Sequence, residues 1–102
     1  MISNNMDVQI DEKIKIKIAE PERYSVIFIN DDQTPMDFVI DVLVTTFKHS
    51  VDTAKNLTLQ IHEDGSAVVG VYAFEIAEQK SVEATTLSRA NGFPLQIKVE
   101  KE

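Results

Sequence analysis

The order of strand and helix patterns constrains this chain more than any other feature. A first apolar run, YSVIFIN at residues 24–30, is rich in β-branched and aromatic residues and predicts a buried strand. Two amphipathic helices, a short strand, a third helix and a last strand follow, at about residues 35–49, 51–62, 67–72, 74–89 and 95–100. The order β-α-α-β-α-β predicts an α+β fold, a small sandwich in which three helices pack on a mainly antiparallel three-stranded sheet.

Start and stop signals support these helices. Thr34 is expected to cap the first helix, with Pro35 at its first position and Asp37 completing a capping box. Ser50 is expected to cap the second helix, and the pair Asn91-Gly92 to end the third. Each boundary therefore has a local chemical cause.

Composition excludes several classes of function. The net charge is −7 and no dense Lys/Arg run occurs, which argues against a nucleic-acid or anionic-membrane surface. The chain has no cysteine, so disulfides, thiol nucleophiles and cysteine metal sites are excluded. No apolar run approaches membrane-spanning length, and the polar, acidic start matches neither a secretory signal nor an Arg-rich transit sequence. With 102 residues, we expect a flexible extension over 1–22 and one core domain over 23–102.

The stretch Asn30-Asp31-Asp32 lies between the first strand and the first helix, and its chemistry has several readings. The acids could stabilise the helix start, bind a metal together with His62, act as an acid/base pair, or surround a cationic ligand. No HExxH or DxDxDG spacing supports a metal site, and neither a nucleophile elbow nor a glycine-rich phosphate loop occurs. The residues alone leave these alternatives open.

A succession of motifs resembles the ClpS family. It consists of Asn30-Asp31-Asp32 followed by Thr-Pro-Met, then Ile61-His62, then GVYAFEIAEQK at residues 70–80 and NGFPL at residues 91–95. The likeness runs from about residue 24 to the end of the chain. Members of this family are small, non-catalytic adaptors that deliver proteins bearing certain N-terminal residues, called N-degrons, to a Clp-type unfoldase and its protease.

The resemblance implies a binding site with two parts. Residues matching those that grip the α-amino group of the N-degron are Asn30, Asp31, Asp32 and His62, with Asp31 either touching the peptide or holding the loop in shape. An apolar pocket for the first side chain (Leu, Phe, Tyr or Trp) would comprise Ile29, Thr34, Met36, Val39, Thr58, Ile61 and Leu95. Neither a metal nor a cofactor is implied, and the chain is not expected to be an enzyme.

Three positions depart from the family pattern. Thr58 stands where relatives often have methionine, so the pocket is expected to be wider there or to carry a hydroxyl, with β-branched first residues admitted. Ala73 replaces a threonine that would cap the third helix, and Gln33 replaces an aromatic residue.

Docking is expected near the start of the third helix. Glu75 and Lys80 match the positions that contact the N-terminal domain of a ClpA- or ClpC-type unfoldase, and both are expected to point outward. The resemblance implies that the chain binds N-degron proteins, and its charge pattern predicts neither nucleic acid nor membrane as a partner. We expect a monomer in the bacterial cytoplasm, or in a plastid stroma if a transit segment has been removed. The alternative is an interaction domain of the same sandwich type without N-terminal specificity.

Overall fold

The computed structural model describes residues 21–102. Its elements, in chain order, are β1 (Arg23–Ile29), α2 (Met36–Thr45), α3 (Val51–Asp64), β2 (Ser66–Ala73), α4 (Phe74–Ala90) and β3 (Gln96–Lys101). The expected extension over residues 1–22 lies outside the described residues, apart from its last two. No helix within residues 21–102 is long and apolar enough to cross a membrane.

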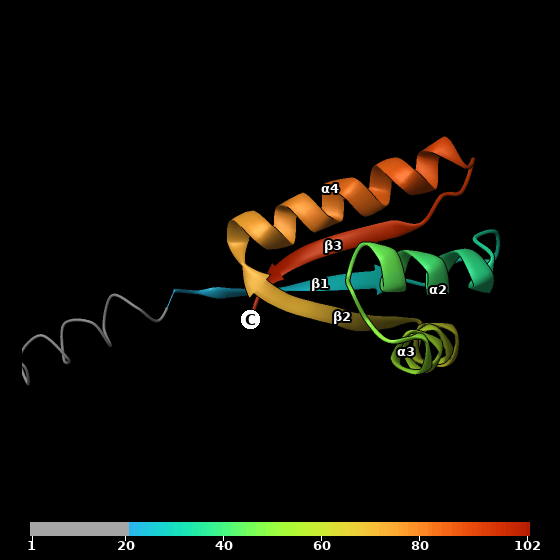
Figure 1. The fold of residues 1–102 in the computed structure, drawn as a ribbon, viewed down its shortest axis with the longest axis horizontal. Coiled ribbons are helices and arrows are strands. Elements are labelled where there is room, and N and C mark those ends of the chain that lie inside the picture. The colour runs from blue at the N-terminus through green and yellow to red at the C-terminus, as the bar shows by residue number, and fades with distance from the viewer. Residues whose placement is uncertain (1–20) are drawn as a thin grey trace, which may run out of the picture.

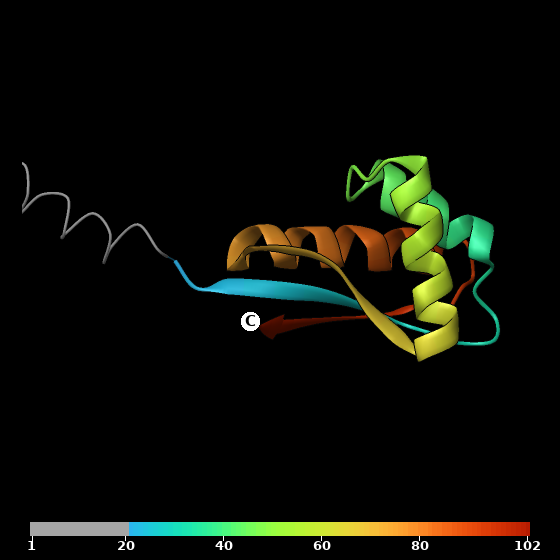
Figure 2. The same ribbon diagram turned by 90° about the horizontal axis from the view of Figure 1, so that it is seen from below.

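The three strands form one antiparallel sheet with β1 at its centre. The strand order is β2-β1-β3, and both neighbours run antiparallel to β1. The three helices lie against one face of this sheet, with α4 running along the strands (Figures 1 and 2). The expected α+β fold, with three helices on an antiparallel sheet, is confirmed.

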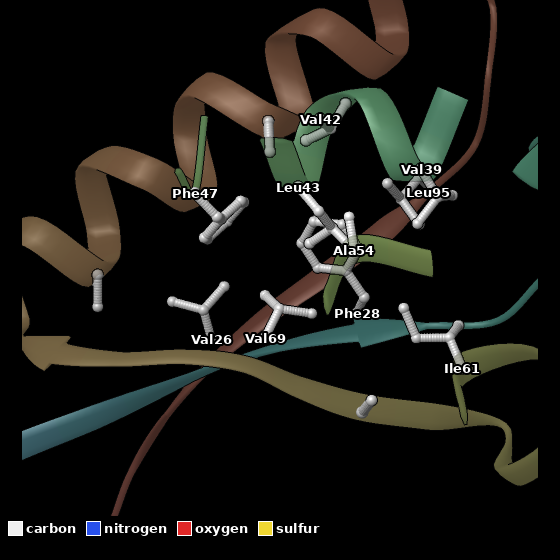
Figure 3. Close-up of a cluster of buried hydrophobic side chains, with 13 residues drawn as sticks. Val26, Phe28, Val39, Val42, Leu43, Phe47, Ala54, Ile61, Val69 and Leu95 are labelled. Atoms are coloured by element: carbon white, nitrogen blue, oxygen red, sulfur yellow. The ribbon is translucent and has the colours of Figure 1, made fainter. Parts of the chain in front are cut away.

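The core lies between the sheet and the helices. Val26 and Phe28 of β1 are fully buried, and the Phe28 ring meets the Phe47 ring edge to face, with centroids 5.4 Å apart (Figure 3). The intervening residues Ile27 and Ile29 are only half-buried because successive side chains of a strand point to opposite faces. The prediction of a buried strand therefore holds for one face of β1 only.

The two helix starts differ from each other. Ser50 caps α3 as expected, because its hydroxyl accepts a hydrogen bond from the Thr53 N–H at 3.1 Å. Thr34 does not cap α2: Pro35 is the N-cap residue, and no side chain caps it. The Thr34 hydroxyl instead donates a hydrogen bond to the carboxylate of Asp31 at 2.8 Å. The hydroxyl that was expected to cap α2 therefore stabilises the loop before that helix.

Lys80 joins α4 to the end of α2. Its ammonium donates a hydrogen bond to the Thr46 carbonyl at 2.8 Å. The same ammonium lies 5.8 Å from the centroid of the Phe47 ring and 5.5 Å from that of the Tyr72 ring. The last carbonyls of a helix have no partner within it, and a cation suits that negative end.

Lys80→Met is therefore expected to lower the free energy of unfolding by about 1–2 kcal/mol, the range for losing a charged hydrogen bond and a cation–π contact. Urea unfolding followed by circular dichroism measures the change. Lys98→Met, at an exposed position on β3, is the matched control and should change stability by less than about 0.5 kcal/mol. Equal stability of Lys80→Met and wild type would show that the Thr46 contact contributes nothing.

Candidate functional site

One end of the sheet gathers the segments on which the site residues lie. There β1 ends, α2 begins, α3 ends and the loop into β3 passes (Figures 1 and 2). The Asn30 N–H donates to the Gly65 carbonyl at 2.9 Å, and Ile29 pairs with Ser66 in the sheet. His62 lies in the last turn of α3, three residues before Gly65. The fold thus brings the neighbourhoods of Asn30 and His62 together across 32 residues of chain.

Three polar side chains at this end are exposed: Asn30, Asp32 and His62. Within residues 21–102, none of them makes a hydrogen bond or ion pair to another side chain or to the backbone. An amide oxygen, a carboxylate and a neutral imidazole nitrogen are all hydrogen-bond acceptors. Their acceptor capacity is open to a ligand that carries donors.

Asp31 plays a different part, because its carboxylate is used within the loop. It accepts hydrogen bonds from the Gln33 N–H at 2.8 Å, the Thr34 N–H at 2.6 Å and the Thr34 hydroxyl at 2.8 Å. Partial burial acts to raise the pKa of this carboxyl, but these hydrogen bonds and the charge of Arg89 outweigh burial and hold the pKa below its usual range. Of the two roles left open for Asp31, the geometry favours holding the loop in shape.

Arg89 links this loop to the segment that carries Leu95. Its guanidinium donates to the carbonyls of Phe93 and Leu95, each at 2.9 Å, and its charge acts on Asp31. The Phe93 ring in turn meets Phe38 of α2 edge to face at 4.9 Å. The sequence reasoning did not identify Arg89. A basic residue in the last turn of a helix was the one signal present, and it is too common to single out a site.

The expected pocket residues fall into two groups. Val39, Ile61 and Leu95 are at most 6% exposed and belong to the hydrophobic core (Figure 3). Met36, which is exposed, and Thr58, which is also buried, line a hollow of about 240 Å³ between α2 and α3, and Thr34 is half-buried in the loop before α2. The buried group forms a wall, and the hollow lies beside it.

Three residues that line this hollow were missed from the sequence: Ile40, Lys55 and Leu59. Ile40 stands four residues after Met36 on α2, and Leu59 four after Lys55 on α3. The i,i+4 spacing puts each pair on one face of its helix and could have indicated them. The Thr58 hydroxyl donates to the Ala54 carbonyl at 2.7 Å. The Thr58 hydroxyl therefore has no free donor, and the wider pocket with its admission of β-branched first residues stays a prediction.

Ile29 is set apart from the other pocket residues. It lies on the face of the sheet that carries no helix in residues 21–102, where it lines a separate hollow of about 430 Å³ with Ile27, Gly65 and Lys98. The alternation of β1 is the reason, because Phe28 points to the helices and its neighbour must point away.

The residues matched to docking also separate. Glu75 is exposed in the first turn of α4, and Ala73 precedes that helix without any side-chain cap. Lys80 differs from the expectation, since its ammonium turns inward to Thr46 and two aromatic rings rather than outward. Within residues 21–102, no group of three His, Asp or Glu side chains is placed to hold a metal ion.

Comparisons with known proteins identify the family of this chain. The family described as "ATP-dependent Clp protease adaptor protein ClpS" matches residues 19–98. The ATP-dependent Clp protease adapter protein ClpS of Treponema denticola is 48% identical over 88 residues, which cover 86% of this chain and 87% of the relative. The protein of the same name from Sodalis glossinidius is 44% identical over 101 residues, covering 97% and 95%.

A solved structure is similar as well. It is that of Agrobacterium tumefaciens ClpS2 bound to L-phenylalaninamide, with a TM-score of 0.79 and 44% sequence identity, covering 81% of this chain and 100% of that one. The relatives are named as adaptors, not as enzymes, in accord with the expectation that this chain is no enzyme. The family match and the identity over most of both chains place this protein in the ClpS family of Clp protease adaptors.

Proposed function

We propose that this adaptor binds proteins whose free N-terminal residue is large and hydrophobic and delivers them to a ClpA- or ClpC-type unfoldase. The observation that carries the proposal is the set of three exposed acceptors, Asn30, Asp32 and His62, beside an apolar wall. The ligand of the similar structure supports it, because L-phenylalaninamide carries a free α-amino group and a benzyl side chain. Its carboxamide stands in for the first peptide bond of a protein that starts with Phe.

The charge of the ligand fits these acceptors. An α-amino group has a pKa of about 7.7–8.0, so it is mostly an ammonium with three N–H donors at neutral pH. Asn30, Asp32 and His62 can each accept one of those hydrogen bonds. Acetylation removes the positive charge and two donors, and it leaves the acceptors without partners, so we expect strong discrimination against blocked N-termini.

The magnitudes are consistent with reversible binding. A buried aromatic side chain contributes roughly 4–6 kcal/mol, and each hydrogen bond to a charged group about 1.5–3 kcal/mol. Association costs roughly 4–15 kcal/mol, and an affinity on the order of micromolar, about 8 kcal/mol, lies within the range that these opposing contributions allow. Such an affinity suits an adaptor that must release what it delivers.

Docking on the unfoldase would involve Glu75, which is exposed in the first turn of α4. Lys80 would contribute by fixing the end of α2 against α4 rather than by direct contact, since its ammonium is bound at Thr46. The absence of a side-chain cap at Ala73 leaves the first N–H groups of α4 free to meet a partner's acceptors.

Fluorescence anisotropy with a labelled peptide that starts with Phe tests the recognition step. The free peptide should bind, while its acetylated twin and an Ala-starting peptide should not. Asp32→Ala and His62→Ala should each weaken binding roughly 10- to 100-fold, the equivalent of one charged hydrogen bond. Glu83→Ala, at an exposed carboxylate of α4, is the control and should bind normally. Equal binding of the free and acetylated peptides would instead indicate an interaction domain without N-terminal specificity.

Asp31→Ala should act through the loop and therefore through stability. At pH 7 we expect a loss of about 1 kcal/mol in the free energy of unfolding, because the loop loses its central acceptor. The pKa of this carboxyl is lower in the folded chain than the usual 3.8, so its contribution is present above 3.8 and disappears as the pH falls through the folded value. Urea unfolding at pH 7 and at successively lower pH should show wild type and Asp31→Ala converging in acid. A gap that does not narrow would contradict this role.

A further inference from the structure

The hollow between α2 and α3 has the size of a subsite. It measures about 240 Å³ and is lined by Met36 and Ile40 of α2 and by Lys55, Thr58 and Leu59 of α3. Pockets for whole small molecules usually hold about 300–1,000 Å³. This one therefore suits a single side chain better than a complete ligand.

The hollow is apolar and open to solvent. Met36 is 40% exposed and Leu59 50% exposed, so two large apolar side chains meet water side by side at one place. A cluster of exposed apolar side chains more often marks a contact surface than an isolated one does. The Thr58 hydroxyl is bonded to its own helix and leaves no free donor in the lining.

The hollow shares two residues with the proposed N-degron site. Met36 and Thr58 line it, and both match pocket positions for the first residue. The other residues expected in that pocket include Val39, Ile61 and Leu95, which are buried in the core as Thr58 is. A peptide whose ammonium is held at Asn30 and Asp32 and whose first side chain meets the buried wall can place its next residue against Met36, the exposed residue at the start of α2.

One charged residue, Lys55, lines the hollow. Lys55 is exposed, and within residues 21–102 its ammonium forms no ion pair. The rest of the chain is acidic, with a net charge of −7. Lys55 therefore gives this hollow a charge preference opposite to that of the ammonium site at Asp32.

We propose that this hollow receives the second side chain of the bound N-degron, preferring a large apolar side chain, and a carboxylate over a cation, at that position. The inference rests on the proposed function, because it takes the first residue to be held at Asn30, Asp32 and His62. It adds a specificity determinant, Lys55 with Leu59, that acts on the residue after the N-terminus. Consecutive Cα atoms are 3.8 Å apart, so the second side chain begins one step from the first.

Anisotropy competition with four peptides tests the proposal. The peptides start Phe-Leu, Phe-Ala, Phe-Glu and Phe-Lys and are otherwise identical. Wild type should bind Phe-Leu about fivefold more tightly than Phe-Ala, and Phe-Glu two- to fivefold more tightly than Phe-Lys at low salt. Leu59→Ala should remove the first preference, and Lys55→Glu should reverse the second. Lys98→Glu makes the same charge change on β3 and should leave both preferences unchanged.

The outcomes separate the inference from the proposed function. If wild type binds free Phe peptides selectively but Lys55→Glu and Leu59→Ala leave the second-residue preferences intact, the subsite is overturned while the function stands. If the two variants change instead the ranking of first residues, the hollow belongs to the first-residue pocket, and the inference is again overturned. If free and acetylated Phe peptides bind alike, the proposed function falls, and this inference with it.

Discussion

The bond from the Asn30 N–H to the Gly65 carbonyl is the contact on which the site depends. Gly65 ends α3 with a φ of 91°, a left-handed conformation that costs other residues roughly 1–2 kcal/mol. This turn sends the chain straight into β2, whose pairing with β1 sets Ser66 opposite Ile29. The exposed acceptors on either side of the contact then share one end of the sheet, although they are distant in sequence.

Around that contact, the charged residues divide into those that build the site and those left for a ligand. The carboxylate of Asp31 accepts hydrogen bonds from within its own loop. Arg89 donates a hydrogen bond to the Leu95 carbonyl, and its positive charge helps to lower the pKa of Asp31. Asp32 next to it stays exposed. Groups whose hydrogen bonds are made within the loop thus hold in place the exposed acceptors Asn30 and Asp32, so binding of an ammonium there, as proposed, would need little reorganisation. In the proposed site, the core residues Val39, Ile61 and Leu95 would also form the wall of the pocket.

Local chemistry made much of this fold predictable from the sequence. The element order and the Ser50 cap follow from periodicity and capping, which depend on neighbours in the chain. Two expectations failed because another partner competed. The Thr34 hydroxyl bonds to Asp31, three residues earlier in the same loop, instead of capping α2, and the Lys80 ammonium bonds to Thr46, 34 residues away. The sequence could not predict which face of the sheet carries Ile29, because that depends on the strand register. It could not predict Arg89 or the hollow at Leu59 either, because neither has a distinctive motif. The proposed joint role of Asn30 and His62 rests on the family resemblance, because no spacing rule in the sequence brings them together.

Nuclear magnetic resonance of the ¹⁵N-labelled chain, titrated with L-phenylalaninamide and with its N-acetylated form, tests the central claim most directly. The account predicts saturable shifts at the side-chain amide of Asn30, the imidazole of His62 and the backbone amide of Leu95 with the free amine, and none with the acetylated form. Shifts confined to the uncovered face of the sheet, at Ile27 and Lys98, or equal responses to both compounds, would contradict it.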